Sequence, residues 1–151
     1  MNRHHKTPMR QKPILRVVSK ILIPFILLFG LYVQFHGDFG PGGGFQAGVI
    51  FAAAFILFAM IYGLNKMREL ANPRLIEILV ASGVLLYGVV GILTMLLHGN
   101  FLEYGVLAHI DPLHPTHGQH RGILWIEAGV GITVAAAMIA IFDAFAARGK
   151  K

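Results

Sequence analysis

Four long apolar segments alternate with shorter polar stretches along the chain and cover residues 14–35, 44–64, 75–97 and 123–145. Each segment holds 21 to 23 residues, and a helix of that length crosses the roughly 30 Å hydrocarbon core of a bilayer. A helix satisfies its own backbone hydrogen bonds inside lipid, whereas an open sheet leaves its edges unpaired. The pattern therefore predicts an all-α integral membrane protein with four transmembrane helices.

Composition supports the same fold class. Of the 151 residues, 56% are hydrophobic and 13% are charged, whereas soluble domains carry about 25% charged residues. The chain has no cysteine, which excludes disulfides, thiolate metal sites and a cysteine nucleophile. It also contains no G-x-S-x-G or H-E-x-x-H motif and no carboxylate pair spaced for acid and base roles. We therefore predict a protein that is not an enzyme and needs no cofactor.

The basic residues predict the orientation of the chain in the membrane. Twelve of the thirteen Lys and Arg residues precede residue 21, lie in residues 65–74 or follow residue 147, and Arg121 is the exception. Because positive residues stay in the cytoplasm during insertion, both termini and residues 65–74 are predicted inside, and residues 98–121 outside. The pI of about 10 then reflects topology and contact with the lipid bilayer, and we expect no nucleic acid as a partner.

The charge pattern also divides the chain. A basic cytoplasmic tail at residues 1–13 precedes a transmembrane domain at residues 14–147, and residues 148–151 form a basic cytoplasmic end. The tail and the apolar segment after it imitate a secretory signal peptide. No small-residue cleavage site follows, because the sequence continues VQFHGD, so we expect the first helix to be retained as a signal anchor.

A glycine-rich loop, HGDFGPGGGFQAG at residues 36–48, separates the first two spans. Consecutive glycines allow positive φ angles and let the backbone lie close to another surface. The loop is not a phosphate loop, because no Lys follows the glycines. A tight turn that simply returns the chain to the membrane is the alternative interpretation.

Small residues recur at helical spacing in three spans and let helix backbones approach in lipid. They are Gly44, Gly48 and Ala52 in the second span, Gly88 and Gly91 in the third, and Ala136, Ala140 and Ala144 in the fourth. The spacing leaves open whether these faces pack within the chain or against other subunits.

Ionisable residues inside the spans are the candidates for an ion path. Glu127 lies four residues into the fourth span, roughly 6 Å below the outer edge. An acidic group at that depth usually faces a partner helix or a water-filled cavity and marks an ion or proton path. An interfacial carboxylate that merely reaches water is the alternative.

Three further candidates lie toward the cytoplasmic ends of their spans: Lys20, Glu77 and Asp143. A buried Lys20 needs a carboxylate, which either acid could supply. The alternatives are that Lys20 extends to the headgroups, that Glu77 pairs with Arg74, and that Asp143 reaches interfacial water.

The predicted outer loop contains His-Pro-Thr-His-Gly-Gln-His, in which His114, His117 and His120 are spaced three residues apart. Imidazoles at such spacing suit zinc or nickel, so a stand-alone divalent-metal-binding membrane protein is one alternative function. Pro115 and Gly118 are expected to prevent a single regular helix from presenting these rings together. A solvated loop or a pH-responsive surface is the simpler interpretation.

The segments FHGDFGPGGGFQAGVIFAAAF and GQHRGILWIEAGVGITVAAAM, together with the four-helix layout, resemble the MnhB/MrpB subunit family of multi-subunit Mrp cation/proton antiporters. The resemblance covers residues 33–147, and its marker is the element Pro41, Gly42, Gly43, Gly44 and Phe45. Related subunits also occur in membrane-bound hydrogenases and similar ion-pumping complexes, which gives a second possible parent complex.

The resemblance implies an accessory subunit of an inner-membrane complex that exchanges cytoplasmic Na+, K+ or Li+ for external protons. Other subunits of that complex are the implied partners. We expect His36, Asp38 and the backbone around Gly42, Gly43 and Gly44 to form an outer vestibule beside Glu127, where carboxylate and carbonyl oxygens would suit hard cations. A purely structural subunit that conducts nothing is the remaining alternative.

Overall fold

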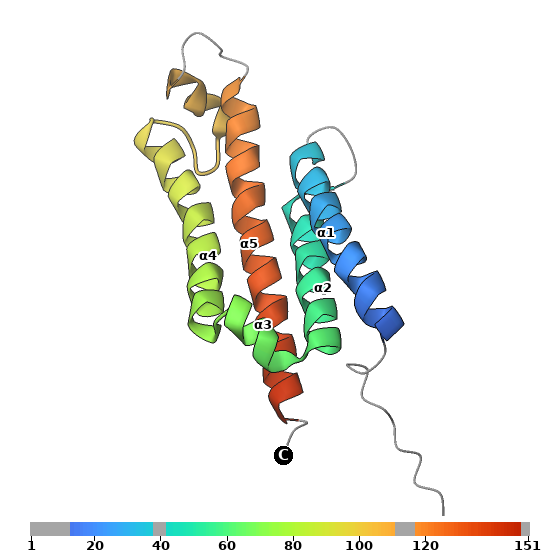
Figure 1. Ribbon diagram of the computed structural model, residues 1–151. Coiled ribbons are helices and arrows are strands. Elements are labelled where there is room, and N and C mark those ends of the chain that lie inside the picture. The colour runs from blue at the N-terminus through green and yellow to red at the C-terminus, as the bar shows by residue number, and fades with distance from the viewer. Residues whose placement is uncertain (1–12, 38–41, 111–116, 149–151) are drawn as a thin grey trace, which may run out of the picture.

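The computed structural model describes residues 13–37, 42–110 and 117–148, and the chain there is helical (Figure 1). The long helices are α1 (Pro13–His36), α2 (Gly44–Tyr62), α4 (Pro73–Leu96) and α5 (His117–Arg148), and the short ones are α3 (Leu64–Leu70) and the 3-10 helix η2 (Tyr104–Ile110). Each of the four long helices is long and apolar enough to cross a membrane. This confirms the predicted all-α fold with four transmembrane helices.

Helix boundaries differ from the predicted ones in several places. α2 ends at Tyr62 because Gly63 adopts φ 101°, which glycine tolerates, and the chain then forms α3, which was not predicted. α5 starts at His117 and runs through Gly118. One glycine inside a helix costs only about 1 kcal/mol relative to alanine. Because α5 begins at His117 and His114 lies outside the described residues, the expectation that no single regular helix presents the three histidine rings together stays a prediction. With 32 residues, α5 is about 48 Å long and extends beyond the hydrocarbon core.

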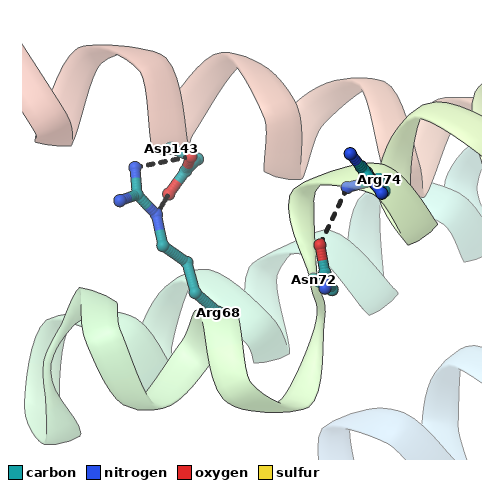
Figure 2. Close-up of polar contacts among 4 residues, drawn as sticks. All are labelled: Arg68, Asn72, Arg74 and Asp143. Atoms are coloured by element: carbon teal, nitrogen blue, oxygen red, sulfur yellow. Dashed lines mark hydrogen bonds and ion pairs between the residues drawn. The ribbon is translucent and has the colours of Figure 1, made fainter.

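The start of α4 is fixed by its own sequence. The side chain of Asn72 accepts a hydrogen bond of 3.0 Å from the backbone N–H of Arg74, as Figure 2 shows, and Pro73 occupies the first turn. Asn at the N-cap and Pro at the first helical position are both favourable. The sharp turn between α3 and α4 therefore needs no long loop.

The long helices form a row in the order α4, α5, α2 and α1 (Figure 1). α5 packs along α4 on one side and along α2 on the other, and α1 packs mainly on α2. The core cluster lies between α2, α5, α3 and the start of α4 and includes Ala52, Met67, Ala136 and Ile139. Small side chains at this contact let α2 and α5 approach closely.

The two ends of the molecule carry different segments. α1 begins and α5 ends where α3 lies, whereas the end of α1, the start of α2 and η2 lie at the opposite end (Figure 1). This is the grouping that the basic residues predicted. That the α3 end faces the cytoplasm stays a prediction.

The segment between α4 and η2 is held by a buried hydroxyl. Thr94, which is fully buried, donates to the carbonyl oxygen of Gly91 at 2.8 Å and accepts from the backbone N–H of Leu102 at 3.0 Å. Tyr104 then packs on Gly122 of α5. Burial of its phenol and, to a smaller extent, the nearby Tyr87 raise the pKa of Tyr104. The start of α5 is thus covered by η2, which precedes it in the sequence.

Candidate functional site

The carboxylate of Glu127 on α5 lies in the bend between α1 and α2. A Cβ atom placed on Gly37 would lie 2.7 Å from Glu127 Oε2, and one placed on Gly43 would lie 2.9 Å from Glu127 Oε1. Real Cβ atoms do not approach so closely, so glycine leaves the room that the carboxylate occupies. Gly43 also adopts φ 139°, a conformation that other residues rarely adopt.

The backbones of α2 and α5 also meet beside Glu127. A Cβ on Gly44 would overlap the carbonyl oxygen of Glu127, and one on Gly48 would lie 2.6 Å from the carbonyl oxygen of Gly131. The small-residue face predicted for the second span, which includes the fully buried Ala52, therefore packs within this chain. This close approach holds Glu127 in register with the start of α2.

The small residues of α4 behave differently from one another. A Cβ on Gly91 would overlap the ring of Phe101, whereas the Cβ position of Gly88 has no described atom within 4 Å. The close approach of α4 to α5 is made instead by Gly83, whose Cβ position faces Thr133 and the carbonyl oxygen of Gly129. A Cβ on Gly88 would thus meet no described atom of this chain, and packing of Gly88 against another subunit stays a prediction.

A second polar side chain, Gln34 of α1, reaches the region one helical turn below Glu127. Its Oε1 lies 2.8 Å from the Cβ position of Gly131, which also faces the carbonyl oxygen of Gly44 at 3.1 Å. Its Nε2 atom is buried and has no hydrogen-bond partner among the described residues. Gln34 was not among the predicted site residues, although an amide inside an apolar span is itself a signal, because a buried amide needs a partner.

Of the two residues that flank Gly37, His36 is described. It ends α1, is exposed, and stacks its ring on Tyr32 with 4.9 Å between ring centroids. Asp38, the other predicted vestibule residue, lies outside the described residues.

The described residues of the PGGGF element have different surroundings. Gly43 and Gly44 lie against Glu127, and Gly42 lies against Val33 of α1. Phe45 is 62% exposed, while Pro41 lies outside the described residues. The part of the element that meets Glu127 is therefore its last two glycines.

At the opposite end of the molecule, Asp143 of α5 forms a bidentate ion pair with Arg68 of α3 (Figure 2). Arg68 Nε donates to Oδ1 at 2.8 Å and Nη2 donates to Oδ2 at 2.9 Å. The hydrogen bond to Asp143 raises the pKa of the Arg68 guanidinium. Such paired hydrogen bonds orient both partners, so the pair ties α3 to α5. Arg68 was not predicted as the partner of Asp143, because 75 positions separate the two residues.

The other two candidates at this end are exposed. Lys20 lies on α1 and makes no hydrogen bond or ion pair with another described residue. Glu77 lies on α4 and, together with Asp143, lines a cavity of about 140 Å³ between α4 and α5. In the described structure Glu77 forms no ion pair with Arg74.

Little of the predicted histidine cluster falls within the described part of the chain. His114 and the side chain of His117 lie outside it, and His120 is exposed in the first turns of α5. Among the described residues, no group of three His, Cys, Asp or Glu side chains could hold a metal ion.

A family model described as "Domain related to MnhB subunit of Na+/H+ antiporter" matches residues 14–140. The chain belongs to the MnhB family. Relatives in the Staphylococcus aureus strains Newman, USA300 and COL are each 35% identical over 127 residues, which cover 80% of this chain and 89% of the relative. Each carries the name "Putative antiporter subunit mnhB2".

The region matched by the MnhB family contains the whole contact between the glycine-rich bend and Glu127, as well as Gln34. It ends before Asp143, so the ion pair with Arg68 is only partly inside it. The family that the PGGGF element and the segment around Glu127 suggested is thereby confirmed.

Proposed function

We propose that this MnhB-family chain is an accessory subunit of a multi-subunit Mrp-type antiporter, which exchanges Na+, K+ or Li+ for protons across the cell inner membrane. The family description and the names of the relatives support an antiporter over a membrane-bound hydrogenase or a stand-alone metal-binding protein. Four membrane-spanning helices support a multi-pass subunit, with both termini in the cytoplasm according to the basic residues.

Within that complex, we assign Glu127 to the path of the exchanged ions. The observation that carries this assignment is the contact of its carboxylate with Gly37 and Gly43. A charged group inside a membrane helix is costly and is retained where it faces a partner helix or water. Glycines at these two positions let the backbone of the bend contact the carboxylate, and we propose that the exchanged ions reach it from the outer end.

Glu127 can couple two ions because its single charge is neutralised by one of them at a time. A proton on the carboxylate removes the negative charge that attracts a cation, and a bound cation displaces the proton. The carbonyl oxygen of Gly44 and Oε1 of Gln34 lie one turn away around Gly131 and add the oxygen ligands that hard cations prefer. We place His36 and Asp38, which flank Gly37, at the outer mouth of this path.

The three predicted ion-path residues at the α3 end of the molecule have different proposed roles. Asp143 is already paired with Arg68, so we assign it to fixing α3. Glu77 is exposed beside a cavity and is the carboxylate that a cytoplasmic cation would meet. Lys20 is exposed on α1 and would pair with a carboxylate of a neighbouring subunit or extend to the headgroups.

The test is the variant Glu127→Gln in the complete antiporter, with exchange measured in inverted membrane vesicles by a pH-sensitive dye after addition of Na+. We expect loss of most exchange while the other subunits still co-purify, because the amide keeps the shape of the carboxylate but not its charge. Glu69→Gln, at an exposed position of α3, is the matched control and should transport normally. Normal exchange by Glu127→Gln would remove Glu127 from the path.

A further inference from the structure

One face of α5 lies open between α2 and α4. A groove of about 360 Å³ runs along it, with Phe51 and Phe55 of α2 on one side, Leu75 and Leu79 of α4 on the other, and Leu70 of α3 at its end. The floor is made by residues of α5, most of them small: Ala128, Gly131, Ile132, Ala135, Ala136 and Ile139. Because α4, α5 and α2 form a row (Figure 1), no long helix of this chain closes the groove within the described residues.

The groove is apolar apart from one side chain, Gln34. Its Nε2 atom has no hydrogen-bond partner among the described residues. An unpaired amide inside a membrane costs several kcal/mol, and an acyl chain that filled the groove would leave that cost in place. The last torsion of a glutamine side chain is soft, so the amide group can turn toward an acceptor that enters the groove.

We propose that the groove receives a transmembrane helix of another subunit of the antiporter, and that this helix presents a hydrogen-bond acceptor to Gln34. A Ser or Thr hydroxyl, an Asn or Gln side chain, or a backbone carbonyl beside a small residue would serve as the acceptor. The floor of small residues lets a helix backbone approach α5 closely, which is how helices associate in lipid. The proposal rests on the antiporter function for the existence of the partner subunit and is independent of any ionic role of Glu127.

The position of the groove gives the partner helix a defined place. Ala128 and Gly131 lie on the floor at the Glu127 end, and Leu70 of α3 lies at the other end. A helix seated there would run along the middle of α5 and pass directly beside the Glu127 site.

Photo-crosslinking tests the occupant. A photoreactive amino acid replaces Ile132, which lines the groove and is 38% exposed, or Leu85 of α4, which is 64% exposed and outside the groove. The complete antiporter is irradiated in membranes, and adducts are identified by mass spectrometry. We expect the Ile132 probe to join one other subunit within a transmembrane segment. Adducts with lipid alone, with a second copy of this chain, or with nothing would overturn the proposal.

A second pair of variants tests the fit. Ala135→Phe fills the groove floor, and Leu85→Phe places the same side chain on the exposed side of α4. We expect Ala135→Phe to abolish the Ile132 adduct and Leu85→Phe to leave it unchanged. An Ile132 adduct that persists in Ala135→Phe shows that the partner lies elsewhere and overturns the assignment.

Gln34→Leu removes the amide and keeps the size of the side chain. Hydrogen bonds between membrane helices are worth only modest free energies, so we expect the co-purified partner subunit to fall by about three- to tenfold. Gln46→Leu, at an exposed position of α2, is the control and should not change it. If Gln34→Leu and Gln46→Leu retain the partner equally, the hydrogen bond to Gln34 is excluded. Failure of Glu127→Gln to impair exchange would leave all these results unaffected.

Discussion

The carboxylate of Glu127 occupies the space into which a side chain at Gly37 would project, since a Cβ there would lie 2.7 Å from Oε2 and 2.8 Å from Oε1. Glu127 lies on α5, whereas Gly37 directly follows α1, ninety positions earlier in the sequence. The glycine-rich bend is therefore more than a turn: its backbone is shaped around one side chain of α5. Substitutions in the bend should act through Glu127.

Gly37→Ala should displace the Glu127 carboxylate without unfolding the chain, because the contact is with the end of a flexible side chain. If Glu127 lies on the ion path, we expect lower exchange activity at normal expression of the complex. Activity is measured as Na+-dependent dye recovery in vesicles. Gly88→Ala is the control, because no described atom lies within 4 Å of its Cβ position. Equal activity of the two variants would contradict a role for the bend in shaping the Glu127 site.

Gly48→Leu should destabilise this chain itself. The Cβ position of Gly48 lies 2.6 Å from the carbonyl oxygen of Gly131 and 2.9 Å from Cβ of Val134, and neither group can move without separating α2 from α5. Overpacking of this kind costs roughly 1–3 kcal/mol or more. We expect a lower melting temperature and less monodisperse protein in detergent when the chain is expressed alone. A chain that is stable alone but fails to assemble would show instead that Gly48 contacts another subunit.

The sequence was sufficient to predict the four membrane-spanning helices, because apolar length is a local signal. That Glu127 matters for transport stays a prediction. The sequence was not sufficient for contacts between distant residues. Arg68 and Asp143 could each be explained locally, and only the position of α3 across the end of α5 brings them together. The amide of Gln34 could have been noticed in the sequence, but its position beside the groove could not. The family was recognisable because its marker element is contiguous.

Thr94→Val should loosen the segment that follows α4. Valine keeps the shape of threonine but leaves the backbone N–H of Leu102 without the acceptor that it has at 3.0 Å. An unsatisfied buried donor costs about 1–3 kcal/mol, and Leu102 also adopts φ 63°, so few alternative conformations are open to it. Faster hydrogen exchange of residues 97–106 by mass spectrometry would report the change.

Thr133→Val is the matched control for this prediction. The Thr133 hydroxyl donates to the carbonyl oxygen of Gly129 in the same helix at 2.9 Å, and no described backbone donor depends on it. We therefore expect a much smaller effect on exchange in residues 97–106. Equal protection of this segment in wild type and Thr94→Val would show that Leu102 finds another acceptor.

The ion pair between Arg68 and Asp143 should be tested by reversing it. Asp143→Arg places two guanidinium groups together and should lower the melting temperature by freeing α3 from α5, whereas adding Arg68→Asp restores opposite charges at the same contact. Because both side chains are partly exposed, the pair is screened by water and salt, and we expect a small effect that shrinks further at high ionic strength.

The fluorescence of the single tryptophan, Trp125, follows unfolding in detergent. If the double variant is no more stable than Asp143→Arg alone, the two residues do not interact in the membrane protein, and Asp143 returns as a candidate for the ion path.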